Sequence, residues 1–360
     1  MNRTHRVAIV GTGAIAEAHM TALRAAGDRV ILVAVVDVDM DRASAFAAKW
    51  GVPRSYASTR ALLDREILDV VHLCTPPRHH TPIALECLAA GVTVFVEKPP
   101  SLSLAEMDEL IEAERASTGH VATVFQHRFG PAAVRLRRLA ADGRLGRPLL
   151  ASCATLWYRD DDYFAVPWRG TWDSEGGGPT MGHGIHQFDL MLSILGPWRE
   201  IRALAARRAR DVQTEDVSMA VVTFASGAVA TVVNSVVSPR ETSMLRFDYE
   251  YATVEVEHLY GYTDADWSVH PVAGHGDLLS LWDEEKSDLV SGHGCQIEAL
   301  YDAVDRDEVP PVGLADARNT MEFVAALYAS AFTAKPVSSG EIIPGDPFYK
   351  SMEGTGAPWQ

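Results

Sequence analysis

A glycine-rich turn near the start of the chain has the residue types that bind the pyrophosphate of a dinucleotide. Residues 11–16 are Gly-Thr-Gly-Ala-Ile-Ala, between a short apolar run and a stretch with helical periodicity. Gly11 permits the tight bend, Gly13 lets the backbone approach phosphates, and the small Ala16 allows a helix to pack closely on a strand. The helix N-terminus then offers free N–H groups to the phosphates. We therefore assign to cofactor binding Gly11, Thr12, Gly13, Ala14, Ile15 and Ala16; a glycine turn without a ligand is the alternative.

Asp37 is the candidate for selecting the cofactor. It follows the second apolar run and lies 24 residues after Gly13, close to the offset of roughly 20 residues expected for an acid that binds the adenosine ribose. Its carboxylate can accept hydrogen bonds from ribose hydroxyls and repels a 2′-phosphate, so it favours NAD over NADP. A helix-capping aspartate is the alternative, which the nearby Asp39 and Asp41 keep open.

Two more segments follow apolar runs, where the strands of doubly wound sheets end and ligands bind. Residues 74–80 are Cys-Thr-Pro-Pro-Arg-His-His, and residues 97–100 are Glu-Lys-Pro-Pro. The proline after Lys98 disfavours helical geometry at that lysine, which predicts that its ammonium is held at the sheet edge beside the cofactor; a surface lysine is the alternative. To the cofactor site we also assign Thr75, Pro76, His79, His80, Glu97, Lys98 and Gln126.

A second constellation begins with Trp-Arg-Gly-Thr-Trp at residues 168–172 and continues through three glycines at 176–178 into a predicted helix. That helix places His183 and His186 on one face, at i and i+3. Histidine suits proton transfer near neutral pH, so both are catalytic candidates, with a hydrogen-bonded core histidine as the alternative for each. Zinc is the competing hypothesis, but no third ligand is spaced nearby, and residues 160–162 (Asp-Asp-Asp) look like a solvated loop. We predict no metal.

The substrate contacts are predicted from side chains that offer aromatic faces, hydrogen-bond donors or proton transfer. Aromatic residues at these spacings are as often part of a core, so the assignment carries that alternative. The candidates are Lys98, Arg128, Trp157, Tyr158, Trp168, Arg169, His183 and His186.

The elements that must position these residues change in character along the chain. In the first third, short apolar runs at 6–10, 30–36, 70–74 and 92–96 alternate with predicted helices at 14–26, 39–49, 82–90 and 103–116. Strands that are apolar throughout and separated by helices indicate a parallel sheet buried on both faces. This predicts a doubly wound α/β domain of the Rossmann type over residues 1–127.

From about residue 149 the predicted elements are mostly strands, at 149–158, 200–206, 217–224, 229–237, 244–249 and 253–258. Helices are predicted at 181–195 and 315–333, and residues 337–360 look like a tail laid over the surface. This predicts an α+β domain over 128–360 with a large, mostly antiparallel open sheet, whose C-terminal helix and tail can pack back on the first domain. Lys98 and His186 fall in different predicted domains, and interdomain clefts are common homes of such sites.

Taken in order, these motifs resemble the Gfo/Idh/MocA family, named after glucose–fructose oxidoreductase, inositol dehydrogenase and a rhizopine-catabolism protein. The resemblance implies hydride transfer to and from sugars, inositols and related polyols, with Lys98 and His186 at the reacting hydroxyl. It also implies a homodimer or homotetramer through the second domain's sheet. Family members often carry an aspartate four residues before that histidine; here the position is Gly182, and His183 is the candidate to replace it.

Composition limits the other function classes. The net charge of −16 repels phosphate backbones and anionic lipid, so nucleic-acid and membrane-surface roles are not expected. No apolar run reaches membrane-spanning length, there is no signal-peptide pattern, and the four cysteines form no CxxC pair, which together predict a soluble cytoplasmic protein. Besides a dehydrogenase, two functions stay open: redox-neutral, NAD-dependent glycoside cleavage or elimination through a transient keto-sugar, and a non-catalytic sensor of NAD or sugar.

Overall fold

The computed structural model describes residues 4–359, and the chain forms two compact units. The first contains the residues up to Val124 together with His293–Arg318, and the second contains Phe125–Gly292 and the residues from Asn319 onward. The sequence pattern predicts that all of 128–360 belongs to the second domain, with the C-terminal helix and tail as the parts that can pack back. In the structure it is His293–Arg318 that belongs to the first unit, because helix α11 (His293–Asp305) contributes Ile297, Leu300 and Tyr301 to that unit's core.

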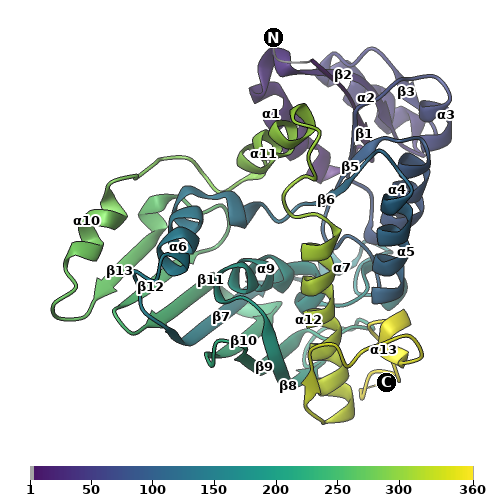
Figure 1. Ribbon diagram of the computed structural model, residues 1–360. Helices are drawn as coiled ribbons and strands as arrows, with labels where there is room; N and C mark the ends of the chain where they lie inside the picture. Colours follow the sequence, from purple (N-terminus) through teal and green to yellow (C-terminus); the bar gives the residue numbers. More distant parts are fainter. Residues whose placement is uncertain (1–3, 360) are drawn as a thin grey trace. The chain divides into compact units, whose positions relative to one another are not determined.

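The first unit is built on a six-stranded, all-parallel sheet with the order β3-β2-β1-β4-β5-β6, whose elements are labelled in Figure 1. The predicted doubly wound fold is therefore confirmed, and the structure adds the short elements β3, α3 and β6. Its strands are β1 His5–Val10, β2 Val30–Val36, β3 Ser55–Tyr56, β4 Val70–Leu73, β5 Thr93–Val96 and β6 Val121–Thr123; its helices are α1 Ala14–Ala25, α2 Met40–Trp50, α3 Thr59–Leu63, α4 His80–Ala89, α5 Leu104–Arg115 and α11.

The second unit is built on an eight-stranded sheet with the order β13-β12-β11-β7-β10-β9-β8-β14. All neighbouring strands are antiparallel except β7 and β10, as the prediction of a mostly antiparallel sheet required. The strands are β7 Pro148–Tyr158, β8 Trp198–Ala206, β9 Val217–Phe224, β10 Val229–Ser235, β11 Val237–Tyr249, β12 Ala252–His258, β13 Trp267–Pro271 and β14 Val337–Ser338. The helices are α6 Pro131–Ala141, α7 Asp161–Phe164, α8 Trp172–Glu175, α9 Ile185–Leu195, α10 Asp277–Asp283, α12 Leu314–Thr333, which starts in the first unit, and α13 Pro347–Lys350.

Strand β11 is longer than its sequence pattern predicts. We expected a strand at 229–237 and another from Met244, but β10 ends at Ser235 and β11 runs from Val237 to Tyr249. Its first half is polar and largely exposed, so it lacks the alternation of a half-buried strand. The pairing with β7 is also irregular between Val237 and Thr242.

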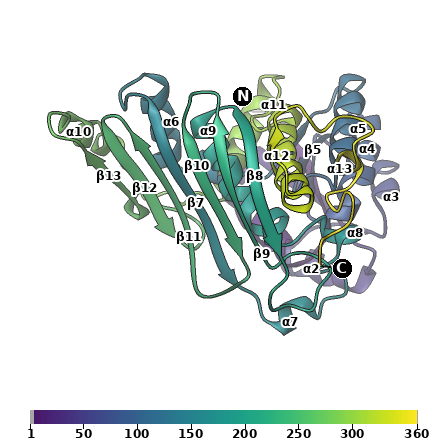
Figure 2. The ribbon, with the colours of Figure 1, turned by 90° about the horizontal axis from the view of Figure 1, so that it is seen from below.

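One face of the second unit's sheet is covered by helices and the other is bare. Helices α6 and α9 lie on the same face in both views (Figures 1 and 2), and in the described part of the chain no helix covers the opposite face. Side chains along β9 point alternately to the bare face and to the covered face: Met219 and Val221 are about half exposed, while Ala220 and Val222 are buried.

The C-terminal segment is more embedded than the surface tail that its glycine and proline content predicts. It adds the edge strand β14 next to β8 and buries Ile342, Phe348 and Met352. Within residues 4–359, no helix has both the length and the apolar character needed to cross a bilayer.

Candidate functional site

The glycine-rich turn between β1 and α1 has the geometry that a dinucleotide needs. Gly11 has φ +90°, and a Cβ there would lie 2.7 Å from the carbonyl oxygen of Cys74 at the end of the neighbouring strand, so only glycine fits. Helix α1 starts after Gly13 with no side chain capping its N-terminus, and there is open space where a Cβ of Gly13 would be. The first N–H groups of α1 are therefore accessible to a phosphate, which is the arrangement that binds the pyrophosphate of NAD.

Asp37, directly after β2, is a buried carboxylate with a fixed orientation. It accepts hydrogen bonds from the backbone N–H and the hydroxyl of Thr12, both at 2.9 Å, and two from Arg42. Burial by itself would raise the pKa of Asp37, but the hydrogen bonds from Arg42, Thr12 and Asp39 outweigh it and lower the pKa to about 2. The capping alternative applies instead to Asp39, whose side chain accepts from the backbone N–H groups of Asp41 and Arg42 at the start of α2.

The segment after β4 contributes one open polar atom and one enclosed side chain. The hydroxyl of Thr75 is buried and has no hydrogen-bond partner among residues 4–359, which fits a group that contacts a bound cofactor. His79 is exposed. His80 is fully buried, with Nδ1 2.7 Å from the carbonyl oxygen of Pro99 and Nε2 2.8 Å from that of Thr75. His80 therefore holds the two strand-end segments together, and its ring nitrogens are already engaged with protein carbonyls.

Glu97, predicted to bind the cofactor, is instead enclosed by protein donors. Its Oε1 lies 2.9 Å from Nε2 of His19 and 2.9 Å from Nε2 of His293, and its Oε2 accepts from the backbone N–H of Lys98 at 3.1 Å. Within the described residues, His19, Glu97 and His293 also form the one cluster with three ligand-type atoms inside 4.8 Å. Their spacing is that of hydrogen bonds to a single oxygen.

In the second unit, the histidine segment begins with a π-helical turn, Thr180–Gly184, and continues into α9. His183 lies in the π turn, with ring contacts to Trp157 and Tyr163. His186, in α9, is 3% exposed, with ring contacts to His127 and Tyr260. The Tyr260 ring in turn contacts Trp157, so both histidines belong to one aromatic cluster. Single π turns occur often at functional sites.

The glycines before this turn are required because other residues of the protein approach their backbone closely. The sequence could not distinguish such residues from a bound ligand. Gly178 packs so closely on Glu215 that a Cβ would overlap the carbonyl oxygen of that residue. The buried Glu215 carboxyl accepts from the backbone N–H groups of Gly178 and Thr180 and from the hydroxyl of Tyr328, at 3.1, 3.0 and 2.9 Å. Burial raises the pKa of Glu215. This carboxyl therefore fixes the backbone that leads into the histidine turn.

Several predicted substrate residues lie around the same aromatic cluster. The guanidinium of Arg169 stacks on Tyr163 and Trp168, at 3.9 and 4.4 Å from the ring centroids, and pairs with Glu175. The indole N–H of Trp157 donates to the hydroxyl of Ser243 at 2.9 Å.

Three other predicted residues have different surroundings. Arg128 pairs with the buried Asp189, and Gln126 is fully buried and donates to the hydroxyl of Tyr260. Tyr158 is 42% exposed at the end of β7.

The sequence motifs do not identify five polar residues that the structure places beside the site segments: His19, His72, His293, Tyr301 and Glu215. One signal was available: His72 interrupts the apolar run of β4, and His19 lies between the buried Ala16 and Leu23 on the inner face of α1. A polar residue at such a position must find a buried partner.

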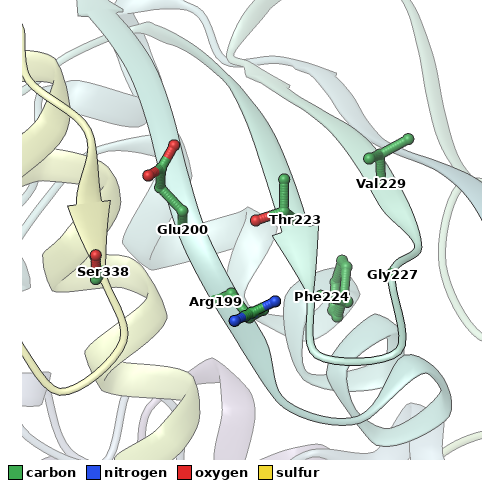
Figure 3. Close-up of a pocket in the computed structure, with 7 residues that line it drawn as sticks. All are labelled: Arg199, Glu200, Thr223, Phe224, Gly227, Val229 and Ser338. Carbon is green, nitrogen blue, oxygen red and sulfur yellow. The ribbon is translucent and has the colours of Figure 1, made fainter.

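A hollow of about 450 Å³ lies elsewhere in the second unit, at the start of β8, the end of β9 and the start of β10 (Figure 3). It is lined by Arg199, Glu200, Thr223, Phe224, Gly227, Val229 and Ser338. None of these is a predicted site residue, so the hollow is separate from the chemistry considered above.

A parallel sheet with an uncapped glycine turn after β1 and an oriented acid after β2 defines a dinucleotide-binding domain. Comparison with protein families agrees. Residues 5–125 match the family described as "Oxidoreductase family, NAD-binding Rossmann fold", and residues 133–257 match the GFO/IDH/MocA C-terminal domain. The chain therefore belongs to the Gfo/Idh/MocA family of oxidoreductases, and its first unit is an NAD-binding Rossmann domain.

Three similar proteins illustrate the family. D-glucoside 3-dehydrogenase of Escherichia coli is 28% identical, with 92% of this chain and 97% of that protein covered. Myo-inositol 2-dehydrogenase of Thermotoga maritima is 29% identical, covering 64% of this chain and 68% of that protein. The crystal structure of the WlbA dehydrogenase of Chromobacterium violaceum, in complex with NADH and UDP-GlcNAcA, superposes with a TM-score of 0.82 and 26% identity, covering 96% of this chain and 98% of that one.

Proposed function

We propose that this protein oxidises a secondary hydroxyl of a sugar, glycoside, inositol or related polyol to the ketone, with NAD as the hydride acceptor. The observation that carries this proposal is the similarity to a D-glucoside 3-dehydrogenase over 92% of the chain, in a protein that retains both Lys98 and His186. A binding protein without turnover would need neither a lysine at the strand end nor a histidine in the π-turn segment.

Lys98 and His186 are proposed to have different roles at the reacting oxygen of the substrate. In the proposed reaction, Lys98 donates a hydrogen bond to the substrate hydroxyl and stabilises the negative charge that develops there. His186 removes the hydroxyl proton as a general base, while the hydride leaves the same carbon. Bound NAD supplies the acceptor for that hydride. The products are a ketone, NADH and one proton.

The phosphates and ribose of NAD are assigned to the first unit. The N–H groups of the Gly11–Ala16 turn hold the pyrophosphate, and Asp37 accepts from the adenosine ribose. Thr75, Pro76 and His79 are proposed as contacts from the neighbouring strand end.

The sugar contacts are assigned to the aromatic cluster of the second unit. Trp157, Trp168 and Arg169 offer aromatic faces and hydrogen-bond donors around His183. His183 itself is proposed to take the role of the aspartate that family members often carry at the position of Gly182. Arg128 and Tyr158 remain predicted contacts of the substrate. Aromatic rings beside hydrogen-bond donors suit a polyol, whose C–H faces are apolar and whose hydroxyls are polar.

The test is a turnover assay at 340 nm with NAD and a panel of methyl glucosides, free sugars and inositols. We expect NADH to accumulate with at least one member of the panel, together with one equivalent of keto product. Product that forms without net NADH would show a redox-neutral cycle. Binding of sugar and NAD without turnover would contradict the proposed function altogether.

The bare sheet face suggests how the protein assembles. Leu150, Val229, Val221, Met219 and Leu204 lie on neighbouring strands of that face and are each between 41% and 53% exposed. Exposed apolar residues gathered on one sheet face are typical of a subunit interface. We propose a homodimer or homotetramer formed through it. All four cysteines are free thiols, which agrees with the proposed cytoplasmic location, where thiols stay reduced.

A further inference from the structure

A chain of buried side chains runs through the first unit and ends at the residue next to Lys98. The hydroxyl of Tyr301 lies 3.1 Å from Nε2 of His72, and Nδ1 of His72 lies 2.9 Å from Nδ1 of His19. Nε2 of His19 then lies 2.9 Å from Oε1 of Glu97. These four side chains come from α11, β4, α1 and the end of β5, and all are at most 5% exposed.

The chemistry of these groups permits one assignment of the protons. Burial raises the pKa of Glu97, but the hydrogen bonds from His19 and His293 more than offset it and hold the pKa well below its usual range; Glu97 is therefore an ionised acceptor. Burial lowers the pKa of His19 and of His72, so both rings are neutral, and each donates through one nitrogen and accepts through the other. His19 must donate from Nε2 to Glu97. His72 must then donate from Nδ1 to His19 and accept the hydroxyl proton of Tyr301.

Glu97 is consequently held from both sides. Oε1 receives two N–H donors, from His19 and His293, and Oε2 receives the backbone N–H of Lys98. A buried carboxylate without such donors is costly, and charge-assisted hydrogen bonds are the strong ones. The arrangement fixes the peptide that carries the Lys98 side chain. Segment His293–Arg318 supplies two of these side chains, His293 and Tyr301. Its place in the first unit therefore matters for the position of Glu97.

We propose that Glu97 is a positioning residue for Lys98, and that the directed chain Tyr301–His72–His19, together with His293, holds the Glu97 carboxylate in place. The proposal rests on the proposed function only for the role of Lys98 in turnover. The hydrogen-bonded set itself is a property of the first unit and can be measured without substrate.

The first experiment determines the protons directly. In protein labelled with ¹⁵N-histidine, long-range ¹H–¹⁵N spectra at pH 7, assigned with His19→Gln and His72→Gln variants, should show neutral rings with the proton on Nε2 of His19 and on Nδ1 of His72. The amide of Lys98 should be protected from hydrogen exchange in the wild type and lose that protection in Glu97→Ala. The opposite tautomers, cationic rings or an unprotected Lys98 amide would each overturn the proposal.

A bound metal is the competing explanation of the same three residues. A nitrogen that coordinates a metal uses its lone pair and carries no proton, so coordination would leave Nε2 of both His19 and His293 unprotonated. Elemental analysis after dialysis against EDTA should show no stoichiometric metal. Retained zinc or another transition metal at one equivalent per chain, lost in Glu97→Gln, would overturn the proposal.

The second experiment asks whether Glu97 acts through Lys98. Glu97→Gln keeps the shape and removes the charge, and we expect kcat to fall about 10- to 100-fold, the range seen when a residue that orients a functional group is lost. KM and the dissociation constant of NAD should stay within about threefold. In a Lys98→Ala background the same substitution should change kcat by less than about threefold. An equal effect in both backgrounds would show that Glu97 acts independently of Lys98 and would contradict the proposal.

A matched pair of tyrosine variants supplies the control. Tyr301→Phe removes the first donor of the chain and should lower kcat severalfold. Tyr56→Phe removes another buried tyrosine hydroxyl of the same unit, one that donates to Glu66 at 2.7 Å, and should leave kcat unchanged. Equal effects of the two substitutions on kcat would show that the hydrogen-bonded chain only stabilises the fold, and would contradict the proposal. If the wild type oxidised no sugar or polyol, the proposed function would fail, while the tautomers and the Lys98 amide would still decide this proposal.

Discussion

Arg42 donates two hydrogen bonds to the carboxylate of Asp37, from Nη2 to Oδ1 at 2.6 Å and from Nε to Oδ2 at 3.0 Å. The aspartate is buried, whereas the Arg42 side chain is half exposed at the start of α2. The carboxylate therefore keeps a defined direction. Its two oxygens already accept five hydrogen bonds, from Thr12, Asp39 and Arg42, so a ribose hydroxyl must replace one of these donors. The carboxylate also keeps the neighbouring guanidinium occupied, and a free guanidinium at this place would favour a 2′-phosphate.

Cofactor choice should depend on Asp37. We expect kcat/KM to favour NAD over NADP by more than tenfold, which corresponds to about 1.4 kcal/mol. Asp37→Ala should shrink this preference, mainly by weakening NAD, because the ribose acceptor is lost and Arg42 is released. Asp39→Ala, which removes the cap of α2 and a 3.9 Å pairing with Arg42 but keeps the Asp37 carboxylate, is the control and should leave the ratio unchanged. Equal use of both cofactors by the wild type would refute the assignment.

Proton transfer should depend on His186. Its replacement by alanine should lower kcat by roughly 10²- to 10⁴-fold, as expected for loss of a general base, and flatten the acidic limb of the pH–rate profile. NAD affinity should barely change. The Lys98→Ala/His186→Ala double variant should be far less than multiplicatively worse than either single variant, because in the proposed mechanism both groups act on one oxygen. A His186→Ala enzyme with near-normal kcat would exclude the mechanism.

The role of His183 can be decided in the same assay. If His183 replaces the aspartate that family members often carry at position 182, His183→Ala should lower kcat nearly as much as His186→Ala does. A Cβ at Gly182 would meet nothing within 4 Å, so a Gly182→Asp/His183→Ala variant has room for the missing carboxylate and should recover part of the lost rate. Unchanged kcat in His183→Ala would leave His183 a structural member of the aromatic cluster.

The pair Arg128–Asp189 should dominate local stability. Asp189 is 1% exposed, receives both Nε and Nη2 of Arg128, and accepts one further hydrogen bond from Thr320. Arg128→Ala leaves a buried charge without its cation and should cost about 3–5 kcal/mol in urea unfolding.

Arg138→Ala, which breaks an exposed pair with Glu285, is the control and should leave the urea unfolding midpoint nearly unchanged. A raised KM with unchanged stability in Arg128→Ala would instead support the predicted substrate contact.

The oligomer should depend on the bare sheet face. Val221 lies in the middle of its apolar residues, so Val221→Glu buries a charge in the proposed interface and should convert the dimer or tetramer to monomer in light scattering coupled to size-exclusion chromatography. Ile67→Glu changes an exposed apolar residue of the first unit and should not alter the mass. A monomeric wild type would rule out the interface.

Much of the fold could be predicted because its signals are local. Apolar runs separated by helices identified the parallel sheet of the first unit. Gly11 was identifiable because the turn after β1 needs a positive φ, and Asp37 because its distance from that turn is fixed by one strand–helix–strand unit. Each signal lies within a short window of sequence, where backbone geometry and side-chain periodicity act directly.

Contacts between distant segments were decided only by tertiary structure. Tyr301 and His72 are 229 residues apart, and His293 and Glu97 are 196 apart; no periodicity links such positions. The glycines at 177 and 178 showed that something approaches the backbone, but only the folded second unit identified Tyr328 and Glu215 as what approaches. The sequence alone thus determined the longer strands and the glycine turn after β1, but not the short strands β3, β6, β13 and β14 or the first half of β11. Packing determined which buried polar groups meet, because a buried donor or acceptor must find its partner wherever the folded chain brings one within hydrogen-bond distance.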